Sequence, residues 1–212
     1  MTDSAVQQAL DAALTLGAAD AEIVCLNSVS LEIEVCGGEI ETLAEAESIG
    51  AGMRVFTADR RMGFAFCSDL NGGLGVLAQA AWQNAQGNDP DPFNLLPTIS
   101  ERSDDDWTEE DYGKRPVAEK VEFAKALEAA TLAGDSRILQ VQQASYGDIV
   151  NDVTIANTHG LFRRYRSGYC SCSVVAVAGT GAGDPEMGWE FDFSRRFDAL
   201  RPDWVAKRCV QC

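Results

Sequence analysis

The chain has 212 residues, of which 46% are hydrophobic and 24% are charged. This is enough apolar material for one substantial core or two small lobes, and it excludes a disulfide-held miniprotein and a disordered tail. The formal net charge of −16 repels nucleic-acid phosphates and anionic membrane surfaces. We therefore expect the protein to bind neither nucleic acid nor membranes.

The start of the sequence and its cysteines indicate where in the cell the protein is located, and its end indicates where the chain stops. The opening stretch MTDSAVQQALDAALTLGAAD lacks a basic start and has helically spaced apolar residues, which is not the pattern of a signal peptide. No apolar run approaches the ~18 residues of a membrane span. Seven cysteines without an export signal predict reduced thiols in a cytoplasmic protein. The last helical pattern, from about Pro202, has no glycine or asparagine cap, so we expect the chain to be cut in or just after an element.

The first third of the chain predicts a helix and an antiparallel meander. Apolar residues between 5 and 16 form a helical stripe that Gly17 closes. Alternating polar and apolar residues then begin, and Gly37-Gly38 forms the two-residue turn of a hairpin. We expect four or five strands within residues 21–67, with a turn at 57–61.

The middle of the chain predicts a helix followed by a long connection. The helix spans about 70–86, and Asp69 is placed to cap it. Residues 87–116 are rich in proline and acidic side chains and predict an irregular surface loop. We expect its apolar side chains to be buried, namely Phe93, Leu95 and Leu96.

The last part repeats the order of helix and strands. A helix is predicted at 117–134, followed by strands with turns at 146–148 and 157–160. The fold class is therefore α+β, with antiparallel meanders and two to three packing helices. A helix followed by a meander occurs twice, which suggests a duplicated unit without a clear sequence repeat. We expect sub-lobes at about 1–86 and 117–200, joined by the loop 87–116.

The only histidine, His159, begins the one stretch that looks chemical, THGLFRRYRSGYCSCS. Asn157 and Gly160 flank it with ordinary turn chemistry, so we interpret it as a turn residue and not as a catalytic or metal-binding one. The arginines that follow are expected to face solvent or a partner. Cys170 and Cys172 are two residues apart on a predicted strand and are expected to face the core.

Other motifs imitate known sites but lack their context. Cys209 and Cys212 have the spacing of redox and zinc motifs, yet they lie inside a predicted helix and no second pair exists. The loops at 71–75 and 179–183 lack the lysine or the following helix that phosphate binding needs. The acidic run 103–111 lacks the spacing of a calcium loop and predicts a solvated loop. We therefore predict no catalytic, cofactor-binding or metal-binding residue in this chain.

Several stretches together carry a resemblance to a known family. They are EIEVCGGEIETLAEAESIGAGMRVFTADRRMGFAFCSDL, NDPDPFNLLP and IANTHGLFRRYRSGYCSCSVVAVA. In this order, and over nearly the whole chain, they resemble the N-terminal half of the PmbA/TldD proteins, also labelled modulators of DNA gyrase. The second stretch and the ending Ser-Asp-Leu of the first look more like the PmbA branch, also called TldE.

The resemblance implies a function that the residues alone do not. TldD-type subunits carry a His-Glu-x-x-x-His zinc motif in a C-terminal domain that is missing from this chain, and PmbA-type subunits lack this motif. The two types pair into a cytoplasmic metallopeptidase that processes unstructured peptides. We therefore expect a TldD-type partner or self-association, extended peptide substrates, and zinc in the partner.

The open alternative is a non-enzymatic binding or scaffolding protein, with a metal site built from its thiols.

Overall fold

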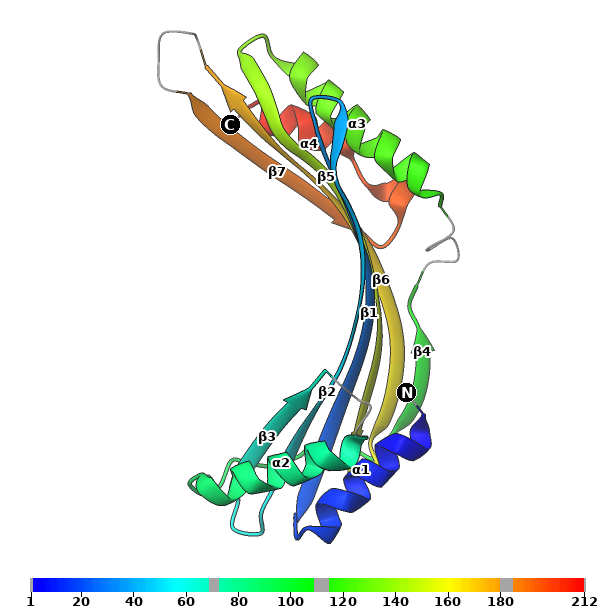
Figure 1. The fold of residues 1–212 in the computed structure, drawn as a ribbon, viewed down its shortest axis with the longest axis vertical. Coiled ribbons are helices and arrows are strands. Elements are labelled where there is room, and N and C mark those ends of the chain that lie inside the picture. Colours follow the sequence, from blue (N-terminus) through cyan, green and yellow to red (C-terminus); the bar gives the residue numbers. More distant parts are fainter. Residues whose placement is uncertain (1, 69–72, 109–114, 180–184, 212) are drawn as a thin grey trace. The chain divides into compact units, whose positions relative to one another are not determined.

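The fold was described from a computed structural model that covers residues 2–68, 73–108, 115–179 and 185–211. The elements in chain order are α1 (Asp3–Thr15), β1 (Asp20–Cys36), β2 (Glu39–Phe56), β3 (Met62–Cys67), α2 (Leu74–Gly87), β4 (Arg102–Asp106), α3 (Val117–Gly134), β5 (Ile138–Asn157), β6 (Phe162–Ala178), β7 (Glu186–Ser194), the 3-10 turn η1 (Phe197–Ala199) and α4 (Pro202–Cys209). The predicted α+β class is confirmed (Figure 1). The predicted cap Asp69 lies outside the described residues.

The described strands form one mixed sheet of seven strands, in the order β3-β2-β1-β5-β6-β4, with β7 also paired to β6. Most pairs are antiparallel, and β4 runs parallel to β6. The chain forms two compact units. Unit 1 comprises Met1–Ser28, Glu47–Asp106 and Asn151–Arg166, and unit 2 comprises Val29–Ala46, Trp107–Val150 and Ser167–Cys212. The long strands β1, β2, β5 and β6 contribute residues to both units.

In unit 1, α1 and α2 pack on one face of the strands (Figure 1). Their apolar stripes bury Val6, Leu10 and Leu77 against Ile23 and Met53, all at most 4% exposed. Burying side chains of this size stabilises the fold by about 1.5–3 kcal/mol each.

Gly63 sets the distance between α2 and β3 in unit 1. A Cβ at this position would lie 2.1 Å from the Ala81 carbonyl oxygen and 2.3 Å from the Ala85 nitrogen. Real side chains never approach this closely, so only glycine lets the helix backbone rest on the strand.

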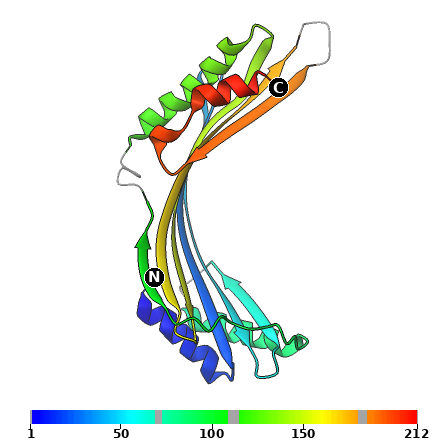
Figure 2. The ribbon, with the colours of Figure 1, turned by 180° about the vertical axis from the view of Figure 1, so that it is seen from behind.

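In unit 2, α3 and α4 cover one face of the strands (Figure 2). The core combines aliphatic residues with the rings of Phe123, Tyr146 and Phe197, whose centroids are 5.1–5.8 Å apart. Lys120 of α3 is 7% exposed, and its Nζ lies 2.5 Å from Asp148 Oδ2. The buried Lys120 ammonium is therefore paired with a carboxylate, as burial of a charge requires.

The strands differ from the sequence expectation in length. Residues 21–67 hold three strands, not four or five, because β2 continues without a break through Ile49-Gly50. The turn predicted at 146–148 is wrong, since this stretch lies within β5. Its Gly-Asp pair looks like a turn, but the buried Tyr146 ring and the ion pair of Asp148 with Lys120 hold it extended.

The connection 87–116 is less irregular than expected. It contains β4, which the acidic composition concealed. Of the three apolar residues predicted to be buried, Leu96 is buried at 6% exposure, whereas Phe93 and Leu95 are 87% and 54% exposed, so the prediction is wrong for these two.

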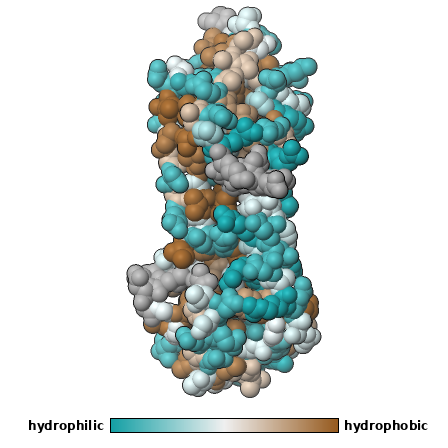
Figure 3. All heavy atoms as spheres, turned by 90° about the vertical axis from the view of Figure 1, so that its right-hand side faces the viewer, coloured by the Kyte–Doolittle hydropathy of each residue, from teal (hydrophilic) through white to brown (hydrophobic). Residues whose placement is uncertain are grey.

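The face shown in Figure 3 carries both polar and apolar side chains. Hydrophilic side chains cover much of the face in Figure 3, in keeping with the formal charge of −16. Within the described part of the chain, no helix has the length and apolarity to cross a membrane.

Candidate functional site

The turn after β5 holds the only histidine. The Asn157 side-chain oxygen accepts the backbone N–H of His159 at 2.9 Å, and Gly160 has a φ of 92°, so the predicted turn is confirmed. His159 Nε2 lies 2.5 Å from Asp20 Oδ1, and its Nδ1 lies 3.3 Å from the Pro97 carbonyl oxygen. Both ring nitrogens are thus directed at acceptors. The histidine therefore ties the start of β1 and the segment before β4 to this turn.

The arginines after the turn are balanced by acidic residues of the same chain. Arg164 Nη2 lies 2.7 Å from Asp3 Oδ1, and Arg163 Nη2 lies 3.5 Å from Asp105 Oδ2 on β4. The expectation that they face solvent or a partner therefore missed their principal neighbours. The first part of the acidic run 103–111, expected to be a solvated loop, lies instead in β4, beside the basic strand β6, and residues 109–111 lie outside the described residues.

Four of the six described cysteines are buried in the two cores. Cys170 and Cys172 are 2% and 1% exposed and face the core, as predicted. Burial raises the pKa of Cys25 to about 11 and that of Cys172 to about 12, so neither is a ready thiolate ligand or nucleophile. Cys209 is also buried in the core of unit 2, and Cys212 lies outside the described residues.

The zinc that the family resemblance implies has no fitting site in the described residues. They contain no group of three or more histidine, cysteine, aspartate or glutamate side chains that could hold a metal ion. Structural zinc takes four ligands and catalytic zinc at least three, so no step through a metal is derived for this part of the chain.

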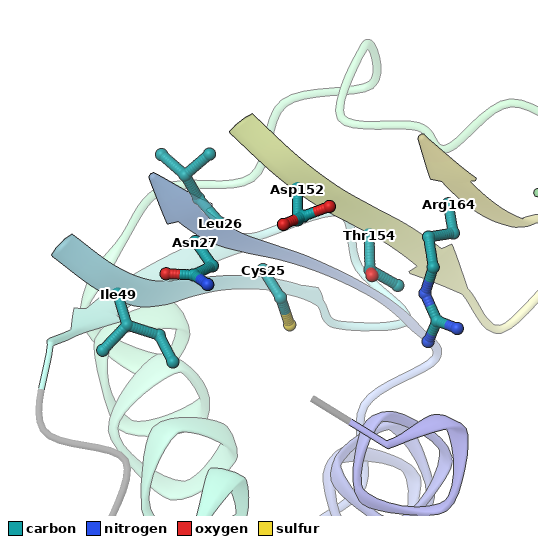
Figure 4. Close-up of a pocket in the computed structure, with 7 residues that line it drawn as sticks. All are labelled: Cys25, Leu26, Asn27, Ile49, Asp152, Thr154 and Arg164. Atoms are coloured by element: carbon teal, nitrogen blue, oxygen red, sulfur yellow. The ribbon is translucent and has the colours of Figure 1, made fainter. Parts of the chain in front are cut away.

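Unit 1 contains a pocket of about 290 Å³ on the strands β1, β2, β5 and β6, which the apolar Leu26 and Ile49 line together with polar side chains (Figure 4). Its lining includes Cys25, Asn27, Thr154, Asp152 and Arg164. The thiol is held protonated by burial, so these lining residues provide hydrogen-bonding groups but no activated nucleophile.

Unit 2 carries an aromatic surface on an edge strand. We call its four residues the β7 ladder: Met187, Trp189, Phe191 and Phe193, which are 66%, 56%, 44% and 67% exposed. The centroids of Trp189 and Phe191 are 5.1 Å apart, and those of Phe191 and Phe193 are 6.3 Å apart. No helix of the described residues covers this face in either view (Figures 1 and 2). Such exposed apolar patches mark binding surfaces.

The other face of β7 is fixed by α4 and the segment before it. Asp192 forms two hydrogen bonds with the Arg201 guanidinium, at 2.9 and 3.0 Å, and these hold the pKa of Asp192 below its usual value. Gly188 permits close contact with α4, since a Cβ there would lie 2.5 Å from the Cys209 carbonyl oxygen. The strand is therefore firmly held on one face and open on the other.

The described sheet has free edges along β3, β4 and β7, and along residues 39–50 of β2, which β3 does not cover and which carry four glutamates. β4 is short and carries three aspartates in sequence, and short charged edges resist pairing with other chains. β3 has six residues, and its Phe64 and Phe66 rings lie over Gly52 and Gly50 of β2. β7 has nine residues, and on its open face the ladder carries no charge. The β7 edge is therefore the best candidate for gripping an extended segment.

The alternation of apolar and acidic residues in GWEFDFS, residues 188–194, predicts the strand β7 but does not tell which of its faces is uncovered. That depends on where α4 packs, which is not readable from the strand itself. The ladder is thus the functional candidate that reasoning from the sequence missed.

Two family models match the chain. The PmbA/TldA metallopeptidase domain 1 matches residues 21–85, and the PmbA/TldA metallopeptidase central domain matches residues 110–211. A protein named Metalloprotease PmbA homolog from Haemophilus influenzae is 28% identical over 214 residues, which cover 98% of this chain and 46% of that protein.

Solved structures share the fold. TldE from Thermococcus kodakarensis superposes with a TM-score of 0.82 at 20% identity, over 98% of this chain and 46% of that one. A candidate modulator of DNA gyrase from Bacteroides thetaiotaomicron gives a TM-score of 0.85 at 19% identity, over 99% and 49%. The chain thus spans about half the length of these relatives. With both domain models matched in order, the chain belongs to the PmbA/TldD family.

Proposed function

We propose that this chain is the N-terminal part of a PmbA-type subunit of a TldD/PmbA-type metallopeptidase assembly that acts on unstructured peptides in the cytoplasm. The two metallopeptidase domain models and the relative named Metalloprotease PmbA homolog support the proposal. In this proposal zinc and the catalytic motif belong to a TldD-type partner. The part described here shapes the path of the substrate and contacts the partner.

The observation that carries the peptide-binding role is the β7 edge with its exposed ladder. An extended peptide added to a sheet edge gains main-chain hydrogen bonds, and its alternate side chains meet the same face of the sheet. The ladder offers apolar contacts with the period of two that such a peptide presents.

The test mixes the full-length protein with a TldD-type partner, zinc and an unstructured peptide. We expect a complex by analytical ultracentrifugation and cleavage products by mass spectrometry. If the mixture shows neither association nor cleavage, the proposal fails.

The alternative of a scaffolding protein with a thiol metal site is less well supported. The raised pKa values of Cys25 and Cys172 disfavour the thiolate form that metals bind. Elemental analysis separates the two functions: stoichiometric zinc that is lost in a Cys209→Ser or Cys212→Ser variant would favour the alternative.

A further inference from the structure

The β7 edge carries a cap of its own. The backbone N–H of Phe191 donates to Glu190 Oε1 at 3.0 Å. The pKa of Asp192 is lowered mainly by the Arg201 side chain, with a smaller contribution from the backbone N–H of Phe193. By contrast, the backbone N–H of Asp192 points toward Cys172 of β6, its partner in the strand register. Because successive residues of a strand point their N–H groups to opposite sides, the ladder residues present theirs to the outer edge.

The two carboxylates on this strand differ in how firmly they are held. Asp192 is fixed by two hydrogen bonds to the Arg201 guanidinium and accepts the Arg201 backbone N–H as well. Glu190 Oε2 lies 3.6 Å from Arg208 Nε, and the side chains of Glu190 and Arg208 are 17% and 51% exposed. A separation of 3.6 Å is longer than a hydrogen bond, so this pair holds Glu190 less firmly than Arg201 holds Asp192. Glu190 is therefore the cap that can leave its N–H group without breaking a bidentate contact.

We propose that Glu190 is a displaceable cap on the β7 edge, which an extended peptide replaces when it adds as a strand beside residues 187–191. This inference rests on the proposed function and names how its peptide is recognised. A peptide carbonyl takes the Phe191 N–H, and apolar side chains at alternate positions cover Trp189 and Phe191. The displaced Glu190 carboxylate then favours a lysine or arginine on the opposite face of the peptide.

The occupant is a peptide and not a second copy of the chain for an electrostatic reason. Each copy carries a formal charge of −16, so two copies repel, while a basic or neutral segment does not. Like charges that face one another across an interface weaken binding of the wrong partner.

The test measures peptide affinity by fluorescence anisotropy, using the 212-residue chain and a labelled, neutral ten-residue peptide of alternating Val and Thr. Glu190→Ala removes the cap and is expected to tighten binding about two- to tenfold, the equivalent of one net hydrogen bond. Glu186→Ala makes the same charge change on the same strand and is expected to leave the affinity unchanged. A second variant, Glu190→Gln, keeps a weaker acceptor and is expected to give a smaller gain.

A peptide that is N-methylated at every residue has no N–H group to pair by either edge, and we expect it not to bind any variant. The cap proposal would be overturned if the methylated peptide bound as tightly as the unmethylated one, or if the wild type and Glu190→Ala had the same affinity for the peptide. Weaker binding by Glu190→Ala would mean that the carboxylate attracts the peptide, and would overturn it too. Dimerisation that competes with the peptide in sedimentation would assign the edge to a second copy.

If no form binds the peptide, the cap proposal is overturned, whereas the proposed function fails separately when the full-length protein and a TldD-type partner show neither association nor cleavage.

Discussion

The hairpin turn between β1 and β2 depends on one glutamate of α3. The Glu128 carboxylate is 3% exposed and accepts the backbone N–H groups of Gly37 at 2.6 Å and Gly38 at 2.8 Å. Both glycines have positive φ, 62° and 79°, which orients their N–H groups toward the same anion. The buried charge and the turn therefore satisfy each other.

We predict that Glu128→Gln lowers the free energy of unfolding by about 2–3 kcal/mol. Each hydrogen bond to the carboxylate contributes about 1.5–3 kcal/mol. The amide keeps one acceptor, but its NH₂ group faces the second N–H, so one bond is lost and two donors are opposed. The neutral amide also costs less to bury, which sets a lower limit of about 1 kcal/mol.

The assay is urea denaturation followed by far-UV circular dichroism, together with thermal unfolding. A loss of 2–3 kcal/mol corresponds to a fall in Tm of about 5–10 °C for a chain of this size. Glu122→Gln is the matched control, because this glutamate lies on the same helix and is exposed; we expect a change below about 0.5 kcal/mol. If both variants lose the same stability, net charge and not the turn contact is responsible, and the reasoning is refuted.

Three further predictions follow from packing and burial. Gly63→Ala forces α2 off β3 and should lower the free energy of unfolding by about 3 kcal/mol or more. Gly75→Ala, in the open first turn of α2, should raise the free energy of unfolding by about 0.5–1 kcal/mol. Urea denaturation compares the two variants, and equal losses of stability would contradict the close approach of α2 to Gly63. The lowered pKa of Asp192 stabilises the fold above its unfolded value of about 3.9 and stops doing so as pH falls through the folded value. Unfolding measured at pH 5 and pH 3 should therefore show a smaller loss on acidification for Asp192→Asn than for the wild type, and equal losses would refute this. Cys25 and Cys172, with pKa values of about 11 and 12, should resist iodoacetamide at pH 8 until urea unfolds the chain, as mass spectrometry of the labelled peptides would show; rapid labelling of the native protein would refute it.

Local signals in the sequence were the most reliable. The turns at Gly37-Gly38 and Asn157–Gly160, the helices and the core-facing Cys170 and Cys172 all follow from chemistry within a few residues. In each case the local sequence alone favours the observed conformation, even where, as at Gly37-Gly38, a distant residue such as Glu128 adds contacts.

Features that depend on distant pairing were missed. β4 pairs in parallel with β6, a strand about 60 residues later, and its aspartates look like a solvated loop until the arginines of β6 lie beside them. Tyr146-Gly147-Asp148 looks like a turn, but Lys120 of α3 and the aromatic core keep it extended. Tertiary contacts decided both cases.

The edges of the sheet explain how a protein with an exposed aromatic strand can avoid pairing with the wrong chain. The acidic edge β4 has its arginines beside it in β6 and offers no apolar face to an incoming strand. On β7 the Glu190 carboxylate takes the outer N–H group of Phe191 and is only weakly paired, whereas the next carboxylate, Asp192, is locked by Arg201. A permanent block would need proline or fixed charge along the whole strand. A weakly paired carboxylate that caps one N–H group instead leaves the edge closed to non-specific pairing. A segment that supplies both a carbonyl and alternating apolar side chains can still displace it.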